Sequence, residues 1–262
     1  MTEKVVVNSY FRPHPDFLVW LEENKDWTFP VNCNSAYSYE GLHDLADIDK
    51  EMQDKNPLLN EVATLIAVER HLEVLPDNPR AIGICNYRRT FDRNAVEATR
   101  DGSVVVGCGI PLGYYGNQVT IEQQYGLMHY QSDWQAFGRA VKSMKWNKFD
   151  EENFNRWKSL TFLPAPCNSF IAPRELFNMY VEDLERFLKS IKREVKETEV
   201  KRRDQYQRRA YAFLCERFLS FWAFNGLVSG WFNLKTRPLH EHLDWKEAGT
   251  EQIDNNGITR SK

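Results

Sequence analysis

The sequence has no apolar run of about 18 residues, the length that a membrane-spanning helix needs, so no transmembrane segment is predicted. Its first residues, MTEKVVVNSYF, lack the long apolar core of a signal peptide. The five cysteines are an odd number and include no Cys-x-x-Cys pair, which disfavours both a disulfide framework and a zinc site. A net charge of −3 gives no overall attraction to nucleic acids or anionic membranes. Together these absences predict a protein of the reducing cytoplasm.

Several motifs with well-defined spacing are also missing. The segment GCGIPLG (107–113) follows apolar residues, but it lacks the Gly-x-Gly-x-x-Gly spacing, and Pro111 stands where a helix should begin. His240 and His242 are two residues apart, which does not place them on one helix face as metal ligands. Asp47 and Asp49 match the Asp-x-Asp pattern with which many sugar transferases hold Mg²⁺ or Mn²⁺, but a polar segment surrounds them. No cofactor is therefore firmly predicted, and these two aspartates are the candidates if a metal binds.

Apolar residues make up 42% of the 262 residues, which is enough for one large domain or two small ones. Short apolar segments predict buried strands at 4–10, 81–85, 103–108 and 167–173. Helical patterns separate these segments, at 15–29, at 56–75 with Asn56 as the cap and Pro57 in the first turn, after Pro173, and at 205–225. The alternation predicts an α/β fold: a mixed sheet flanked by helices, with a helical C-terminal part. Residues 1–234 are expected to form a single domain, and residues 235–262 a polar tail.

Polar residues are expected at the ends of three of the expected strands. They are Asn8, Ser9 and Tyr10, then Asn86, Tyr87, Arg88 and Arg89, and finally Asn168 and Ser169. In α/β sheets ligands bind beyond the carboxyl ends of strands, so these groups are expected to converge. The arginine side chain is a fork of donors that matches phosphate oxygens. If the chain stays extended, Asn86 and Arg88 face one way and Tyr87 and Arg89 the other, so one arginine reaches a ligand while the other forms an ion pair.

Two features of the C-terminal half involve charge. Residues 186–209 contain ten basic and four acidic residues, which fits either a solvated helix face or a contact with a polyanion through Arg202, Arg203, Arg208 and Arg209. On the last expected helix, Arg209 and Glu216 lie seven residues apart on one face, with Phe213 between them. A glutamate inside AFLCERFLSFW needs a partner or a function, and the adjacent Arg217 is not expected to pair with it on the same face. A structural charge network remains the alternative for this glutamate.

Blocks of the sequence resemble a known family. They are KNPLLNEVATLIAVERHL (55–72), IGICNYRRTF (82–91), CNSFIAPRELFNMYVEDL (167–184) and YQRRAYAFLCERFLSFW (206–222), with an echo in YGLMHYQSDW (125–134). In order and spacing they are similar to a domain of bacterial capsular and exopolysaccharide glycosyltransferases, first catalogued as of unknown function and GT-A-like in fold. The chain departs from the family pattern at Asn86, where a histidine is usual, and at Ser169, Ala212 and Cys215.

The resemblance implies a GT-A-like glycosyltransferase that uses a nucleotide-diphosphate sugar. Arg88 or Arg89 would neutralise the donor diphosphate in place of a metal, Asn86, Tyr87 and Asn168 would line the donor site, and the segment from Asn8 to Arg12 would touch the nucleotide. Glu216 is the first candidate for the catalytic base, with Asp204 and His129 in reserve.

The resemblance leaves the acceptor open. It implies a bacterial surface glycan, which can be lipid-linked, or, for a phage enzyme acting in its host's cytoplasm, a hydroxymethylated DNA base. The alternative from a different class is a non-catalytic protein that binds nucleotides or sugars on a degenerate transferase fold.

Overall fold

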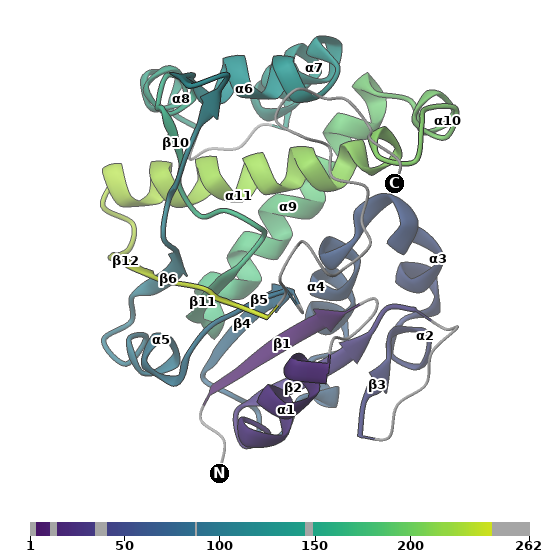
Figure 1. Cartoon of the computed structure of the whole chain (residues 1–262), viewed down its shortest axis with the longest axis vertical. Helices are drawn as coiled ribbons and strands as arrows, with labels where there is room; N and C mark the ends of the chain where they lie inside the picture. Colours follow the sequence, from purple (N-terminus) through teal and green to yellow (C-terminus); the bar gives the residue numbers. More distant parts are fainter. Residues whose placement is uncertain (1–3, 11–14, 35–40, 87, 145–148, 243–262) are drawn as a thin grey trace.

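A central mixed sheet organises the computed structural model, which describes residues 4–10, 15–34, 41–86, 88–144 and 149–242 (Figure 1). The strand order is β12-β6-β11-β4-β1-β2-β3. The strands are β1 (Lys4–Tyr10), β2 (Thr28–Asn32), β3 (His43–Asp44), β4 (Ala81–Asn86), β6 (Val104–Gly107), β11 (Phe170–Pro173) and β12 (Leu234–Arg237). Most neighbours are parallel, but β11 runs antiparallel to both β4 and β6. The mixed α/β sheet predicted from the sequence is confirmed.

Helices cover the sheet and form a separate layer at one end of it (Figure 1). They are α1 (Pro15–Glu23), α2 (Leu45–Ile48), α3 (Lys50–Leu59), α4 (Glu61–Arg70), α5 (Arg93–Glu97), α6 (Ile121–Met128), α7 (Gln131–Ser143), α8 (Glu151–Lys158), α9 (Arg174–Glu194), α10 (Glu197–Val200) and α11 (Ala210–Val228), with 3-10 turns at Leu72–Val74 and Gln207–Arg209. Minor strands are β5 (Arg89–Thr90), β7 (Ile110–Pro111), β8 (Gly113–Tyr114), β9 (Asn117–Gln118), β10 (Phe162–Leu163) and β13 (His240–Glu241). No helix within the described ranges is both long and apolar enough to cross a bilayer.

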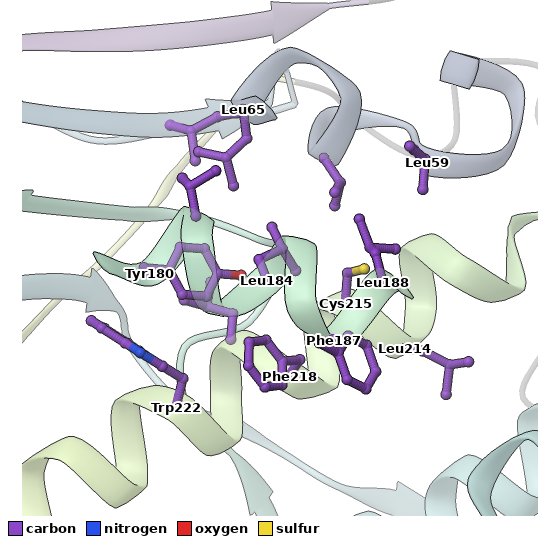
Figure 2. Packing of buried hydrophobic residues seen from close by; sticks show 14 of the residues in the cluster. Leu59, Leu65, Tyr180, Leu184, Phe187, Leu188, Leu214, Cys215, Phe218 and Trp222 are labelled. Atoms are coloured by element: carbon purple, nitrogen blue, oxygen red, sulfur yellow. The ribbon is translucent and has the colours of Figure 1, made fainter. Parts of the chain in front are cut away.

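The core is built on helices α9 and α11, which pack against each other, and α9 also packs on strands β4 and β11. The apolar stripe of α9 is buried, and Phe187 stacks on Phe218 of α11 with ring centroids 4.6 Å apart (Figure 2). Tyr180 of α9 meets Trp222 of α11 edge to face, with centroids 5.1 Å apart. Because α11 is apolar on almost every side, it is buried along most of its length. This packing fixes the N-terminal turns of α11 above the sheet, where a cavity lies.

The helix expected at 56–75 is divided in two. Helix α3 begins at Lys50, contains Pro57 and ends at Leu59. Asn60, whose φ is 49°, separates it from α4. Asn56 is not a helix cap, because it is buried inside α3 and its Nδ2 donates to the carbonyl of Cys33. The physical reason is that Asn60 tolerates a left-handed backbone and so ends one helix while starting the next. The break places the first residue of α4, Glu61, beside the carboxyl end of β4.

Two further segments differ from the sequence-based expectation. Residues 109–165, where no helix was predicted, contain α6, α7 and α8, and α7 buries a stripe that includes Trp134, Phe137 and Val141. Residues 235–241, expected to begin a polar tail, extend the sheet through β12 and β13. None of the four residues of β12 is fully buried, and three of them are polar, so this edge strand carries little apolar signal in its sequence.

Gly83 provides a test of the packing between β4 and β11. A Cβ at this glycine would lie 2.7 Å from Cγ1 of Ile171 and 2.9 Å from the carbonyl oxygen of Phe170. We expect Gly83→Ala to lower the free energy of unfolding by about 1–3 kcal/mol, because the strands must separate to admit the methyl group. Urea denaturation measures this change. The control is Gly138→Ala in α7, where the nearest atom to the added methyl is 4.0 Å away and stability should be unchanged or higher. Equal stability of the two variants would contradict the close strand approach.

Candidate active site

A cavity of about 130 Å³ lies where β4 ends, between the sheet and the helical layer. Four segments line it: the turn after β4, the turn before β11, the start of α4 and the start of α11. The lining residues are Asn60, Glu61, Asn86, Arg88, Arg89, Cys167, Asn168, Arg209, Ala212, Phe213 and Glu216. The convergence expected for the polar groups around residues 86–89 and 168 is therefore observed.

The backbone turns sharply after β4. Oδ1 of Asn86 accepts hydrogen bonds from the backbone N–H groups of Arg88 and Arg89, both at 3.0 Å. Asn86 also pairs with Arg89 across the β4–β5 ladder. The chain does not stay extended, so the expected alternation of the two arginines is wrong, and both line the cavity. The short carboxamide of Asn86 suits this Asx-type turn, which gives the residue a structural role. Tyr87 lies outside the described residues.

Arg89 has partners on two sides. Its Nε donates to Oε1 of Glu241 on β13 at 3.0 Å, and its Nη1 contacts Sγ of Cys167 at 2.7 Å. Strand β13 is itself held against β5, and the backbone N–H of His242 donates to the carbonyl of Arg88. The ion pair expected for one of the two arginines is thus made by Arg89, and its partner comes from the segment that was expected to be a tail.

The turn before β11 has an unusual backbone. Ala165, Cys167 and Asn168 all have positive φ, at 49°, 65° and 50°. Non-glycine residues rarely adopt this region, and such strain concentrates at functional sites. Asn168 is 7% exposed, and its Oδ1 is buried without a hydrogen-bond partner. This turn precedes β11 rather than following it. It reaches the carboxyl end of β4 because the two strands are antiparallel.

Glu216 lines the cavity, but both of its carboxylate oxygens have partners. Oε1 accepts from the backbone N–H of Cys167 at 2.6 Å, and Oε2 accepts from Nη1 of Arg217 at 2.8 Å. The expectation that Arg217 would not pair with Glu216 is wrong, because the guanidinium reaches the neighbouring carboxylate. Arg209, Phe213 and Glu216 all line the cavity, as the seven-residue spacing predicted, although Arg209 lies in the 3-10 turn before α11. Glu216 therefore ties α11 to the strained turn at Cys167.

Glu61 was not singled out from the sequence, yet it is the second carboxylate of the cavity. Burial raises its pKa, and the charge of Glu216 adds to the increase, while Arg88 and Arg209 act in the opposite direction. The sequence signal that could have revealed this residue is the Asn60-Glu61 pair, in which an asparagine that can break a helix precedes a first-turn acid.

The two reserve candidates for the base lie outside the cavity lining. His129 packs on Phe213, with ring centroids 4.2 Å apart, and burial, together with the charge of Arg217, lowers its pKa to about 4. It is therefore neutral at physiological pH. Asp204 is exposed, and its Oδ1 accepts from the backbone N–H of Gln207 at 2.9 Å, which caps the 3-10 turn before α11.

The four arginines proposed from the sequence as acceptor contacts occupy different environments. Arg203 forms a bidentate ion pair with Asp133 of α7, at 2.5 and 2.8 Å. Arg209 lines the cavity and stacks over Phe213, with the guanidinium carbon 5.1 Å from the ring centroid. Arg202 and Arg208 are exposed on the segment that leads to α11. Only Arg209 of the four is thus part of the cavity.

The remaining predicted residues belong to β1 and to the Asp-x-Asp segment. Asn8, Ser9 and Tyr10 form the carboxyl end of β1, where the backbone of Ser9 lies opposite Asn86. Arg12 lies outside the described residues. Asp47 is in α2, and Asp49 caps α3 by accepting from the N–H of Met52 at 3.0 Å. Within the described residues, no group of three or more His, Cys, Asp or Glu side chains is placed to hold a metal ion.

The site is electropositive at its centre. Three arginines face two carboxylates in the cavity lining, and the N-terminal turns of α4 and α11 both reach it. Helix N-termini carry partial positive charge and unpaired N–H groups, which favour anions. Asn168 adds an acceptor that requires an O–H or N–H donor. The arrangement suits a ligand that carries both anionic oxygens and hydroxyl groups.

The fold is that of a glycosyltransferase structure. The chain superimposes on the apo structure of WbbM, a bifunctional glycosyltransferase, with a TM-score of 0.71 and 13% sequence identity. The match covers 93% of this chain but 46% of that chain, so the chain spans about half the length of WbbM.

The sequence defines the family. Residues 47–226 match the model of the family described as Domain of unknown function (DUF4422), and the chain belongs to that family. No curated protein matches the sequence.

Proposed function

We propose that this protein is a glycosyltransferase that moves a sugar from a nucleotide diphosphate to an acceptor hydroxyl. The observation that carries the proposal is the composition of the cavity, where Arg88, Arg89 and Arg209 share the lining with Asn168, whose buried Oδ1 has no hydrogen-bond partner among the described residues. A phosphate group alone supplies no donor at neutral pH for that oxygen, whereas a sugar hydroxyl does. The glycosyltransferase fold supports the same conclusion.

The cavity is too small for a whole nucleotide sugar, so we propose that different parts of the donor bind at two neighbouring places. Its volume of about 130 Å³ is below the range of roughly 300–1,000 Å³ that holds a whole drug-sized ligand. We therefore assign the sugar ring and the adjoining phosphate to the cavity. The nucleotide would extend along the sheet edge toward Asn8, Ser9 and Tyr10, whose backbone lies beside Asn86.

The arginines provide the chemistry that sugar transfer needs at the leaving group. Breaking the bond between the sugar and the diphosphate leaves additional negative charge on the diphosphate. Positive groups beside it are therefore worth more in the transition state than in the ground state. We propose that Arg88 and Arg209, aided by the N-termini of α4 and α11, partly or wholly replace a metal ion in this role.

A glycan is a better fit than DNA for the acceptor. Several basic side chains of the segment 186–209 form ion pairs within the protein. Arg186 pairs with Glu182, Lys201 with Glu197, and Arg203 with Asp133. These contacts reduce the charge available to a polyanion. Binding to DNA would weaken steeply with salt, so duplex binding in low salt that disappears in high salt would favour the DNA acceptor instead.

A thermal-shift screen of UDP-, GDP- and dTDP-linked sugars tests the proposal. A donor at about 100 times its dissociation constant stabilises the folded state by about 2.7 kcal/mol, which raises the Tm of a domain of this size by about 5–10 °C. The donor that gives the largest shift is then incubated with the protein, and released nucleoside diphosphate is measured. A shift without any release, with water or simple glycosides as acceptors, would support the non-catalytic alternative. The absence of any shift would contradict the donor site.

A further inference from the structure

We propose that Glu61, rather than Glu216, is the catalytic base that accepts the proton of the acceptor hydroxyl. This assignment rests on the glycosyltransferase function proposed above. It follows from a difference between the two carboxylates of the cavity. Both oxygens of Glu216 accept hydrogen bonds from Cys167 and Arg217, whereas Glu61 is the first residue of α4 and lines the cavity there.

The position of Glu61 is set by Asn60, the residue that separates helix α3 from helix α4. The left-handed φ of 49° at Asn60 ends α3 and turns the first residue of α4 toward the end of β4. Glu61 is half-buried and lines the same cavity as Arg88 and Asn168. Its carboxylate accepts a hydrogen bond from its own backbone N–H, so the side chain stays at the N-terminus of α4. An acceptor hydroxyl that enters the cavity can therefore approach this group.

Glu216 occupies the opposite wall with a different set of contacts. One oxygen accepts from the N–H of Cys167 and the other from Arg217, which is 4% exposed. Both oxygens are thus engaged by protein groups, one of them the buried Arg217, which leaves them less available to an acceptor hydroxyl. Its geometry fits a positioning residue, one that holds Cys167 and Asn168 in place.

Titratable groups from each surrounding segment share the cavity lining with Glu61. Arg88 and Arg89 come from the turn after β4, Cys167 from the turn before β11, Arg209 from the 3-10 turn before α11, and Glu216 from α11 itself. Burial raises the pKa of the Glu61 carboxyl, and Glu216 raises it further, against the influence of Arg88 and Arg209. A carboxylate with a raised pKa is a stronger base, and its basicity moves toward the operating pH.

The reaction balances with these groups alone. The acceptor oxygen forms a bond to the anomeric carbon of the donor, while its proton passes to the Glu61 carboxylate. The bond between that carbon and the phosphate oxygen breaks, and the electron pair leaves with the nucleoside diphosphate beside Arg88 and Arg209. Water in the acceptor position gives donor hydrolysis by the same route.

The test compares Glu61→Gln with Glu216→Gln and with a matched control, Glu175→Gln. Glu175 is also a first-turn glutamate, in α9, but it is exposed and lies outside the cavity lining. The assay measures hydrolysis of the nucleotide sugar that gives the largest thermal shift. Glu61→Gln should lower kcat by about 100- to 10,000-fold. Glu216→Gln should lose less activity, because its amide oxygen can still accept from the Cys167 N–H, and Glu175→Gln should match the unaltered protein.

Binding is followed separately, through the rise in Tm that the donor produces. The donor should raise the Tm equally in Glu61→Gln and in the unaltered protein. The pH profile gives an independent readout, since kcat should fall as the pH drops through the raised pKa of Glu61, and this limb should persist in Glu216→Gln. Full turnover by Glu61→Gln, or a larger loss in Glu216→Gln with the donor-induced Tm shift intact, would overturn the assignment. If the unaltered protein neither binds nor hydrolyses any donor, the proposed function fails instead.

Discussion

Replacing Arg88 by alanine should lower kcat/KM for the nucleotide sugar by about 100- to 1,000-fold, the usual effect of removing a donor that stabilises developing negative charge. Arg88 lines the cavity beside Glu61 and Arg209, and its position is fixed by the Asn86 carboxamide, which binds the Arg88 backbone N–H. The loss should fall mainly on kcat, because the charge of the leaving diphosphate grows in the transition state. Steady-state kinetics of donor hydrolysis, with Tm measured in parallel, checks both statements.

The matched variants make this prediction specific. Arg88→Lys should recover part of the activity, since lysine restores the charge but not the planar fork of donors. Arg100→Ala, at an exposed arginine paired with Glu97 far from the cavity lining, should leave kinetics unchanged. Arg89→Ala should lose stability as well as activity, because Arg89 also binds Glu241 and so holds β13.

A metal ion would change the interpretation of these kinetics. The same assays in EDTA and in Mg²⁺ or Mn²⁺ show how much of the leaving-group charge the arginines carry alone. Complete dependence on metal, together with full activity of both Arg88→Ala and Arg89→Ala, would contradict the role given to the arginines.

The sequence predicted which segments meet at the site, but not the conformations that create it. Strand β4 was predictable because its residues are apolar from Ala81 to Cys85, and Asn86 was expected at its carboxyl end. Asn168 meets Asn86 for a reason that was not predicted, because its turn precedes a strand that runs antiparallel to β4. The alternation argument failed at Asn86, because a side-chain hydrogen bond to the backbone turned the chain where extended geometry was assumed. Such local competition between side chain and backbone is not visible in hydrophobic periodicity.

The base candidates illustrate a second limit of the sequence. Glu216 was conspicuous because it interrupts an apolar helix, yet its contacts with Cys167 and Arg217 explain why it is there. Glu61 was inconspicuous because acids are common in first helical turns, where the helix dipole favours them. Its importance arises from the break at Asn60 and from the arrangement of three other segments, which depends on long-range packing.

The second large effect is expected on stability, and it comes from the ion pair between Asp133 and Arg203. Asp133 is 2% exposed and Arg203 is 11% exposed, and their side chains join in a bidentate contact. Tyr130 packs under the guanidinium, with its ring centroid 4.4 Å from the guanidinium carbon. We expect Asp133→Ala to lower the free energy of unfolding by about 3–5 kcal/mol, because it leaves a buried, uncompensated charge. Guanidinium or urea denaturation followed by far-UV circular dichroism measures the loss.

Replacing both partners together distinguishes the loss of the ion pair from the cost of leaving one charge unpaired. Asp133→Leu combined with Arg203→Met should be more stable than Asp133→Ala alone, since apolar groups can fill the site without an unpaired charge. Glu22→Ala provides the surface control, because Glu22 pairs with Lys25 where both side chains are more than two-thirds exposed, at 74% and 72%, and its loss should leave stability nearly unchanged. A small effect of Asp133→Ala, similar to that of Glu22→Ala, would contradict the structural role.

This pair also connects stability with the site. It anchors the segment before α11 to α7, and that segment ends at Arg209, which lines the cavity. A variant that loses the pair should therefore lose donor hydrolysis at temperatures where it is still folded, through displacement of Arg209. If Arg203 instead bound a polyanionic acceptor directly, Arg203→Met would weaken acceptor binding, and Asp133→Ala would leave stability and donor hydrolysis unchanged. The structural role predicts that Asp133→Ala lowers stability and donor hydrolysis together.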